Sequence, residues 1–213
     1  RYAFKDDSSG YLGARREHLY LFALATRKSE ALTSGIFDEE SPSWSPDGSQ
    51  ISFVSKRAED PDRTRDWNVF VMDAKAGSPQ RQLTTFKGGD STPGGDRPVW
   101  SPDGKSIAYI QGGPPELIFY AVRSLAVIPA SGGTSRVLTA SLDRNVGDPQ
   151  WSADGTSMYF TVQDDRTNQL ASISASGGTL RRSADGLHDG NSVDVAGGHA
   201  GVLRPRFQPG QPI

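Results

Sequence analysis

The sequence predicts an all-β protein, a β-propeller with four-stranded antiparallel blades, and three observations lead to that prediction. A seven-residue motif recurs three times, at residues 42–48, 98–104 and 149–155. Its tryptophans are 56 and 51 residues apart, at Trp44, Trp100 and Trp151. Short apolar strands separated by Gly-containing turns follow each motif. Repeats of this length, made of short strands, are typical of propeller blades.

Each copy of the motif has the order Pro-x-Trp-Ser-Pro/Ala-Asp-Gly, which predicts the start of a strand and a tight turn. We expect the proline to begin a strand and the tryptophan to fill the wedge between two sheets. The Asp-Gly pair suits a hairpin, because Asp bonds its own backbone and Gly accepts positive φ. The predicted structural residues are Trp44, Asp47, Gly48, Trp100, Asp103, Gly104, Trp151, Asp154 and Gly155. An active site occurs once, so acids that recur in every unit indicate turns.

The strands after the motifs complete three four-stranded units. The second strands are expected at 51–54, 107–110 and 158–162, and the third strands at 67–72, 121–128 and 169–173. Fourth strands follow a Gly-containing turn, at 80–84 and 136–139. The expected blades span about residues 34–84, 85–139 and 140–182.

Both ends of the chain match only part of a blade. Residues 18–24 and 30–33 resemble a third and a fourth strand, whereas 191–198 and 200–204 resemble a degenerate first strand and a second strand. We expect a partial propeller over 1–204, with half blades at 1–33 and 183–204 and a Pro- and Gly-rich tail at 205–213. We interpret the chain, which begins at Arg1, as a fragment of a longer polypeptide.

Two arrangements of the half blades are open to a chain of this kind. The ends could pair and close a four-bladed ring, which would remove exposed sheet edges. We expect an open arc instead, because bulky tryptophan wedges suit the gentler rotation per blade of a larger propeller.

Composition excludes several classes of function. No apolar run approaches the roughly 20 residues of a membrane helix, so we expect no membrane partner. The net charge of −2 and the pI of about 5.9 argue against nucleic acid, which requires a basic surface. The absence of cysteine excludes disulfides, thiolate catalysis and sulfur-bound zinc.

No catalytic or metal motif is found in the sequence. The chain has no Gly-x-Ser-x-Gly element, and its three histidines are scattered, at His18, His188 and His199. The acidic stretches at 6–10 and 59–66 lack the alternating ligands of a calcium loop, and we interpret them as solvated turns. The basic residues at 56–65 are assigned to the same solvated connection. We therefore expect no catalytic residue, metal or cofactor in this chain.

The Trp-Ser-Pro-Asp-Gly-x-x-Ile-x-Phe unit resembles the TolB-like propeller repeat, which occurs in TolB and in the propellers of prolyl oligopeptidase-family serine peptidases. The resemblance covers about residues 18–204. The opening segment 1–20 and the late segment 192–198 resemble the acylaminoacyl-peptidase-like branch, although Ala153 replaces the proline of the third turn. This resemblance implies a propeller of about seven blades and a C-terminal α/β-hydrolase domain with the Ser-Asp-His triad, which lies outside this chain.

The resulting hypothesis is a non-catalytic propeller segment of such a peptidase. Its implied partners are the α/β-hydrolase domain and a peptide substrate, with the propeller capping the active site and restricting access. The alternatives are a TolB-like protein–protein interaction propeller and a propeller fused to an amidohydrolase domain. The peptidase reading favours the cytoplasm, and the TolB-like reading the periplasm. The residues encoded after Ile213 discriminate between the three.

Overall fold

The computed structural model describes residues 5–6, 10–11, 16–59, 61, 64–92, 96–164, 167–182, 193–196 and 199–202. Within these residues the protein is all-β, apart from one 3₁₀ helix, η2 (Pro115–Tyr120). Three four-stranded antiparallel sheets dominate, which we name blades A, B and C. Blade A contains β5 (Glu39–Trp44), β6 (Gln50–Ser55), β7 (Asn68–Asp73) and β8 (Arg81–Gln82). Blade B contains β9 (Val99–Trp100), β10 (Ser106–Gln111), β11 (Ser124–Pro129) and β12 (Arg136–Val137), and blade C contains β13 (Val146–Trp151), β14 (Ser157–Asp164), β15 (Thr167–Ser174) and β16 (Arg181–Arg182).

Smaller sheets flank the three blades. The N-terminal half blade pairs β3 (Tyr20–Ala23) with β4 (Lys28–Ala31), and the C-terminal half blade pairs β17 (Val193–Ala196) with β18 (His199–Val202). A further pair, β1 (Lys5–Asp6) and β2 (Gly10–Tyr11), precedes them. The fold class is confirmed: the chain is a partial propeller with three complete blades and a half blade at each end.

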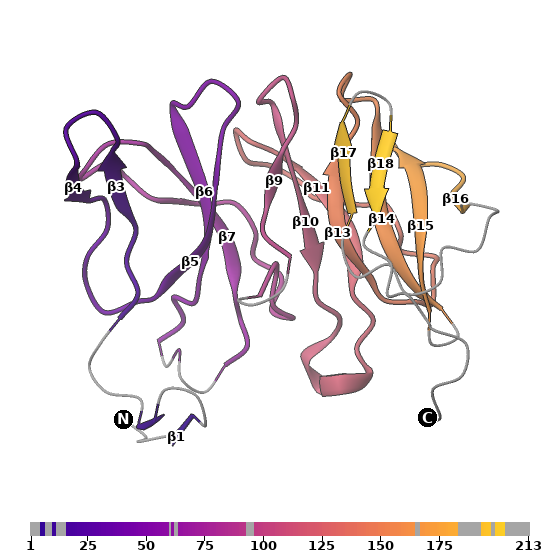
Figure 1. The fold of residues 1–213 in the computed structure, drawn as a ribbon. Helices are drawn as coiled ribbons and strands as arrows, with labels where there is room; N and C mark the ends of the chain where they lie inside the picture. The colour runs from indigo at the N-terminus through magenta and orange to yellow at the C-terminus, as the bar shows by residue number, and fades with distance from the viewer. Residues whose placement is uncertain are drawn as a thin grey trace, which may run out of the picture.

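The blades stand side by side and form an open arc. Neighbouring first strands contact one another, from β5 to β9, from β9 to β13 and from β13 to β17. The two half blades lie at opposite sides of the view in Figure 1 and share no sheet. Ring closure through these two pairs does not occur, in agreement with the expectation from the tryptophan wedges.

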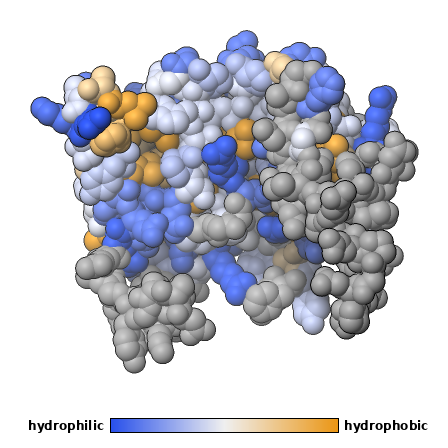
Figure 2. Space-filling view, viewed as in Figure 1, coloured by the Kyte–Doolittle hydropathy of each residue, from blue (hydrophilic) through white to orange (hydrophobic). Residues whose placement is uncertain are grey.

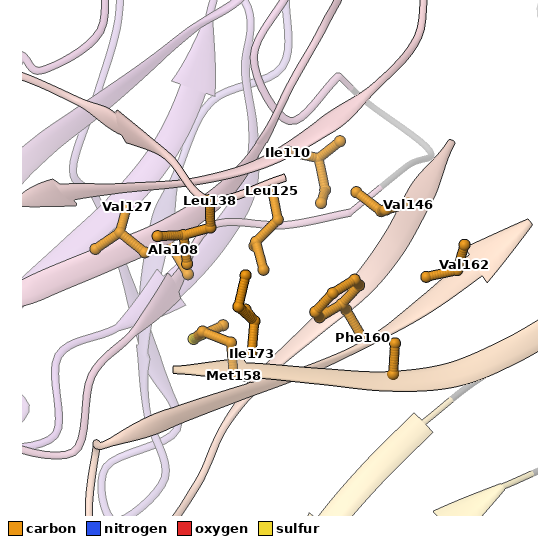
Figure 3. Packing of buried hydrophobic residues seen from close by; sticks show 11 residues of the cluster. Ala108, Ile110, Leu125, Val127, Leu138, Val146, Met158, Phe160, Val162 and Ile173 are labelled. Carbon is orange, nitrogen blue, oxygen red and sulfur yellow. The ribbon is translucent and has the colours of Figure 1, made fainter. Parts of the chain in front are cut away.

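The apolar core is divided among the wedges between adjacent sheets. Leu19 and Leu32 of the N-terminal half blade pack on Phe53 and Phe70 of blade A. Two further clusters fill the wedges between blades A and B and between blades B and C. Figure 3 shows the last of these, in which side chains of β10 and β11 face Met158, Phe160 and Ile173. The stacking of sheets through their apolar faces is therefore what holds the arc together.

One threonine contact identifies the strands of the N-terminal half blade. The hydroxyls of Thr33, Thr84 and Thr139 each accept the backbone N–H of a third-strand residue, over 2.9 Å. Those donors are Leu19, Val69 and Leu125. Because the contact is the same in all three sheets, β3 and β4 are equivalent to the third and fourth strands of a blade.

The three Asp-Gly turns repeat one hydrogen-bond pattern. In blade A, the Ser45 hydroxyl donates to Asp47 (2.6 Å) and accepts the backbone N–H of Gln50 (2.9 Å). Equivalent bonds form around Asp103 and Asp154. The glycines that follow, Gly48, Gly104 and Gly155, each have a φ of 70°. Ala153 changes nothing in this pattern, because the serine, the aspartate and the glycine carry it.

The tryptophans differ in burial, and the expectation of three buried rings is wrong for Trp44. Trp100 is 6% exposed and Trp151 is half-buried, whereas Trp44 is 51% exposed. The Trp100 indole N–H donates to the carbonyl of Ser43 (3.1 Å), and that of Trp151 to Val99 (3.0 Å). Each acceptor carbonyl belongs to the residue directly before the tryptophan of the neighbouring, N-terminal blade. Among the described residues the sheet of β3 and β4 has no first strand, so Trp44 lacks this contact.

The same missing cover exposes apolar residues on the N-terminal half blade. Tyr20 is 65% and Phe22 54% exposed, whereas the equivalent Phe70 and Met72 of blade A are 3% and 1% exposed. Figure 2 shows apolar side chains gathered over β3 and β4 at the upper left.

The prediction that a proline begins each first strand is wrong in two of the three blades. Pro42 lies inside β5 and Pro149 inside β13, each at a β-bulge. A bulged residue takes no part in the regular ladder, so the missing N–H costs nothing there. Pro98 directly precedes β9. The tail at 205–213 lies outside the described residues.

Candidate functional site

Three adjoining hollows lie at the end of the arc where first strands begin and second strands end. They have volumes of about 270, 380 and 630 Å³, and Asp96 lines all of them. The connections from β6 to β7 and from β10 to β11 extend from this end, at the bottom of Figure 1. The second connection includes η2, whose Tyr120 is 88% and Leu117 49% exposed. This end is the concave, loop-bearing face of the segment and its candidate binding site.

Two carboxyl groups and one guanidinium set the charge of these hollows. The backbone N–H of Asp148 donates to Asp96 over 2.5 Å, and Arg123 lies 3.8 Å from the same carboxylate. Burial, followed by the charge of Asp96, raises the pKa of Asp148. Arg123 is about half-exposed and Asp96 is nearly buried. The site therefore offers an accessible cation beside an acid whose pKa is raised.

Backbone strain is concentrated at the same place. Ser41, Ser91 and Asp148 have φ values of 52°, 49° and 50°, in the left-handed region that non-glycine residues rarely adopt. Ser91 lines the first hollow, and Ser41 and Asp148 line the third. Such strain costs of order 1–3 kcal/mol per residue and clusters at binding sites.

A close crossing of two backbone segments forms one wall of the first hollow. The N–H of Gly112 donates to the carbonyl of Gly89 over 2.9 Å. A Cβ on Gly112 would lie 2.1 Å from the carbonyl oxygen of Gly88 and 2.5 Å from that of Gly89. Only glycine fits at this position, so the crossing fixes the course of the connection that carries η2.

A position at the start of the first strand differs between the blades. Glu39, Asp90 and Val146 are equivalent: their backbone N–H groups donate to the carbonyls of Glu17, Trp67 and Arg123. Glu39 follows Thr33 by six residues and Asp90 follows Thr84 by six, whereas Val146 follows Thr139 by seven.

In blade A this position is the centre of a buried ionic network. Glu39 is 4% exposed and accepts hydrogen bonds from His18 (2.8 Å), Thr33 (2.8 Å) and Arg57 (3.1 Å). The Arg57 guanidinium lies 4.3 Å from the centre of the Phe70 ring. The prediction that residues 56–65 form only a solvated connection is therefore wrong for Arg57, whose charge is paired with a buried acid that the sequence pattern does not reveal.

In blade B the equivalent acid has no such compensation. Asp90 is fully buried, and neither of its carboxylate oxygens has a hydrogen-bond partner among the described residues. Burial raises its pKa to about 7, and the negative charge of Asp66 adds to the rise, while the nearby Thr84 hydroxyl opposes it. In blade C the polar group is replaced by Val146, which removes the cost of a buried acid.

The nine repeat residues predicted from the sequence take no part in this site. Asp47, Asp103 and Asp154 lie in turns at the opposite end of the blades. Hydrogen bonds from the neighbouring serines lower the pKa of all three, to about 2 for Asp47 and Asp154. They remain predicted structural residues, and the site is formed by residues that the sequence pattern did not select.

The other residues considered in the sequence are placed as follows. His18 belongs to the Glu39 network, and His199 is exposed. His188, Asp60 and Asp62 lie outside the described residues, as does most of the segment 1–15. The part of the chain that the structure describes holds no group of three or more His, Asp or Glu side chains arranged as a metal site.

Asp96, Asp148 and Arg123 were not predicted from the sequence, because none of them belongs to a repeated motif. The Leu-Thr pairs at 32–33, 83–84 and 138–139 do recur, and an acid six residues after two of them is the signal that could have revealed Glu39 and Asp90.

The fold and the repeated contacts define the chain as a β-propeller segment, similar in fold to TolB. Over 154 residues it is 29% identical to dipeptidyl-peptidase 5 of Trichophyton schoenleinii, a match that covers 69% of this chain and 21% of that protein. The chain thus spans about a fifth of the length of the curated relatives that it matches. No family model matches the chain.

Two solved structures show the same fold. TolB from Acinetobacter baumannii has a TM-score of 0.59 and 18% identity, covering 87% of this chain and 45% of that one. A structure from a study of two prolyl endopeptidases has a TM-score of 0.60 and 15% identity, covering 83% and 27%. No helix in the described part of the chain is long and apolar enough to cross a membrane.

Proposed function

We propose that the chain is a non-catalytic propeller segment of a prolyl oligopeptidase-family serine peptidase, which caps the active site and restricts access to peptides. The observation that carries this proposal is the similarity to dipeptidyl-peptidase 5 over 154 residues, 69% of this chain. The match to only a fifth of that protein supports a catalytic domain outside this chain.

The Asp96 end of the arc is the face that we assign to the active site. It has the hollows, the strained residues and the exposed loop side chains Leu117 and Tyr120. Arg123 and the Asp96–Asp148 pair supply polar contacts for an extended peptide. A folded substrate cannot follow a peptide into hollows of a few hundred Å³, so selection acts by size. By this proposal the chain alone does not hydrolyse peptides, because nucleophile and base belong to the other domain.

The coding sequence that continues past Ile213 tests the proposal. A Gly-x-Ser-x-Gly element within a downstream α/β domain is expected. The full polypeptide should then cleave short peptides and leave a folded protein with the same target sequence intact, whereas the 213-residue chain should cleave neither. Turnover by the isolated chain, lost on substitution of one of its serines and one histidine, would contradict the proposal.

A TolB-like interaction propeller is the second candidate, favoured by the coverage of 87% of this chain in the match to TolB. A stop codon soon after Ile213 would support it. The third, a propeller fused to an amidohydrolase, requires metal-binding histidine pairs downstream.

A further inference from the structure

The buried acid of blade B stands out when the equivalent positions of the blades are compared. In blade A, Glu39 has three donors, one of which is the cationic guanidinium of Arg57. In blade C, Val146 avoids the problem. Asp90 is as deeply buried as either, and both of its oxygens lack a hydrogen-bond partner among the described residues. A buried carboxylate is normally paired, neutralised or bound to a metal.

Three side chains donate to Glu39, and the equivalent positions around Asp90 keep one of them, change one to an amide and lose one. Leu19 is equivalent to Val69, so His18 is replaced by Asn68, and Arg57 is replaced by Gly113, which has no side chain. Thr84 keeps the place of Thr33. Blade B therefore retains the acid and the hydroxyl of this network but loses its cation.

The side-chain amide of Asn68 bonds to Asp66 and Thr84. Its amide Nδ2 donates to the carboxylate of Asp66 over 3.0 Å, and its Oδ1 accepts the Thr84 hydroxyl over 3.4 Å. The Asn68 N–H groups thus serve Asp66, and neither oxygen of Asp90 accepts a hydrogen bond among the described residues. Asp90 is held beside these groups, because its backbone N–H donates to the carbonyl of Trp67 over 2.7 Å, and a second carboxylate, Asp66, is close enough to raise its pKa.

We infer that Asp90 anchors a site for an oxygen-coordinated divalent cation of the Ca²⁺ class, in the wedge between blades A and B. Carboxylate, hydroxyl and amide oxygens are the ligands that such cations take, with water completing the shell. Asp66, Thr84 and Asn68 are the additional ligands. The cation takes the electrostatic place that Arg57 occupies beside Glu39, and it stabilises the contact between the two blades.

Calcium titration of the full 213-residue chain at pH 7.5, after treatment with chelator, tests this site. We expect one Ca²⁺ per chain by calorimetry and a rise in the thermal midpoint with CaCl₂ that follows ligand linkage. Tb³⁺ should give emission sensitised by Tyr109 and Trp67. Asp90→Asn should weaken binding at least tenfold, and Asp103→Asn, which removes an exposed turn acid, should leave it unchanged.

Absence of Ca²⁺ binding to the wild-type chain, or equal binding by Asp90→Asn, would overturn the inference. An infrared carboxylic-acid band assigned to Asp90 at pH 6.5 that CaCl₂ does not remove would show that a proton neutralises the group instead. If Asp90→Asn does not fold, Asp66→Asn decides: this half-exposed residue should fold, and its Ca²⁺ affinity should fall several-fold, whereas an unchanged affinity would refute the site.

Discussion

Truncation of Trp100 to alanine should destabilise the arc far more than the same change at Trp44. The two residues occupy equivalent places in the repeat, but Trp100 is 6% and Trp44 51% exposed. Trp100 fills the wedge between blades A and B and donates to the carbonyl of Ser43 over 3.1 Å. The contrast isolates the effect of the neighbouring blade from that of the sequence motif.

The expected magnitudes follow from burial. Trp100→Ala removes a buried aromatic side chain, which costs about 3–5 kcal/mol. Trp44→Ala removes a ring whose exposed half contributes little, so we expect about 1 kcal/mol or less. Trp100→Phe keeps most of the volume and leaves one carbonyl unpaired, at a cost of about 1–2 kcal/mol.

Urea unfolding followed by circular dichroism measures these free energies, and an unchanged slope shows that the same surface is exposed in each variant. Trp100→Phe serves where Trp100→Ala does not fold. Equal destabilisation by Trp44→Ala and Trp100→Ala would refute the argument, because the motif alone and not the adjacent blade would then set the contribution of the ring.

Three further predictions concern the backbone crossing at Gly112, the acid Glu40 beside the β-bulge of β5, and the threonine contact of Thr139. Gly112→Ala should lower stability by about 1–3 kcal/mol, seen as a lower thermal midpoint, because its Cβ would lie 2.1 Å from the Gly88 carbonyl. The pKa of Glu40 is raised from 4.5 to about 7 by burial, so this residue's unfavourable contribution grows from pH 4.5 to pH 7. Glu40→Gln should therefore stabilise the chain at pH 8 by roughly 1 kcal/mol after solvent screening and change little at pH 4.5, and equal effects at both values would contradict this. Thr139→Val should cost about 1–2 kcal/mol in urea unfolding, because the Leu125 N–H loses its acceptor, while Thr139→Ser keeps it.

The sequence by itself determined the repeat unit and its turns. The contacts of the Ser-x-Asp-Gly turn are local, with partners at most five positions apart, so the chemistry of the residues is enough to specify them. The strand order and the half blades follow from the same periodicity, because a four-stranded meander pairs only consecutive strands. These features required no knowledge of how one blade packs on another.

Only the tertiary structure decided what happens between blades. Trp100 and Trp151 are covered by the preceding blade, whose carbonyls, 57 and 52 residues earlier, accept their indole N–H groups, whereas Trp44 has no such contact among the described residues, so similar motifs have different surroundings. The compensation of Glu39 by Arg57 and its lack at Asp90 likewise depend on residues from separate strands and connections. Local chemistry repeats along the chain, whereas burial and charge pairing are set by neighbours that the repeat does not encode.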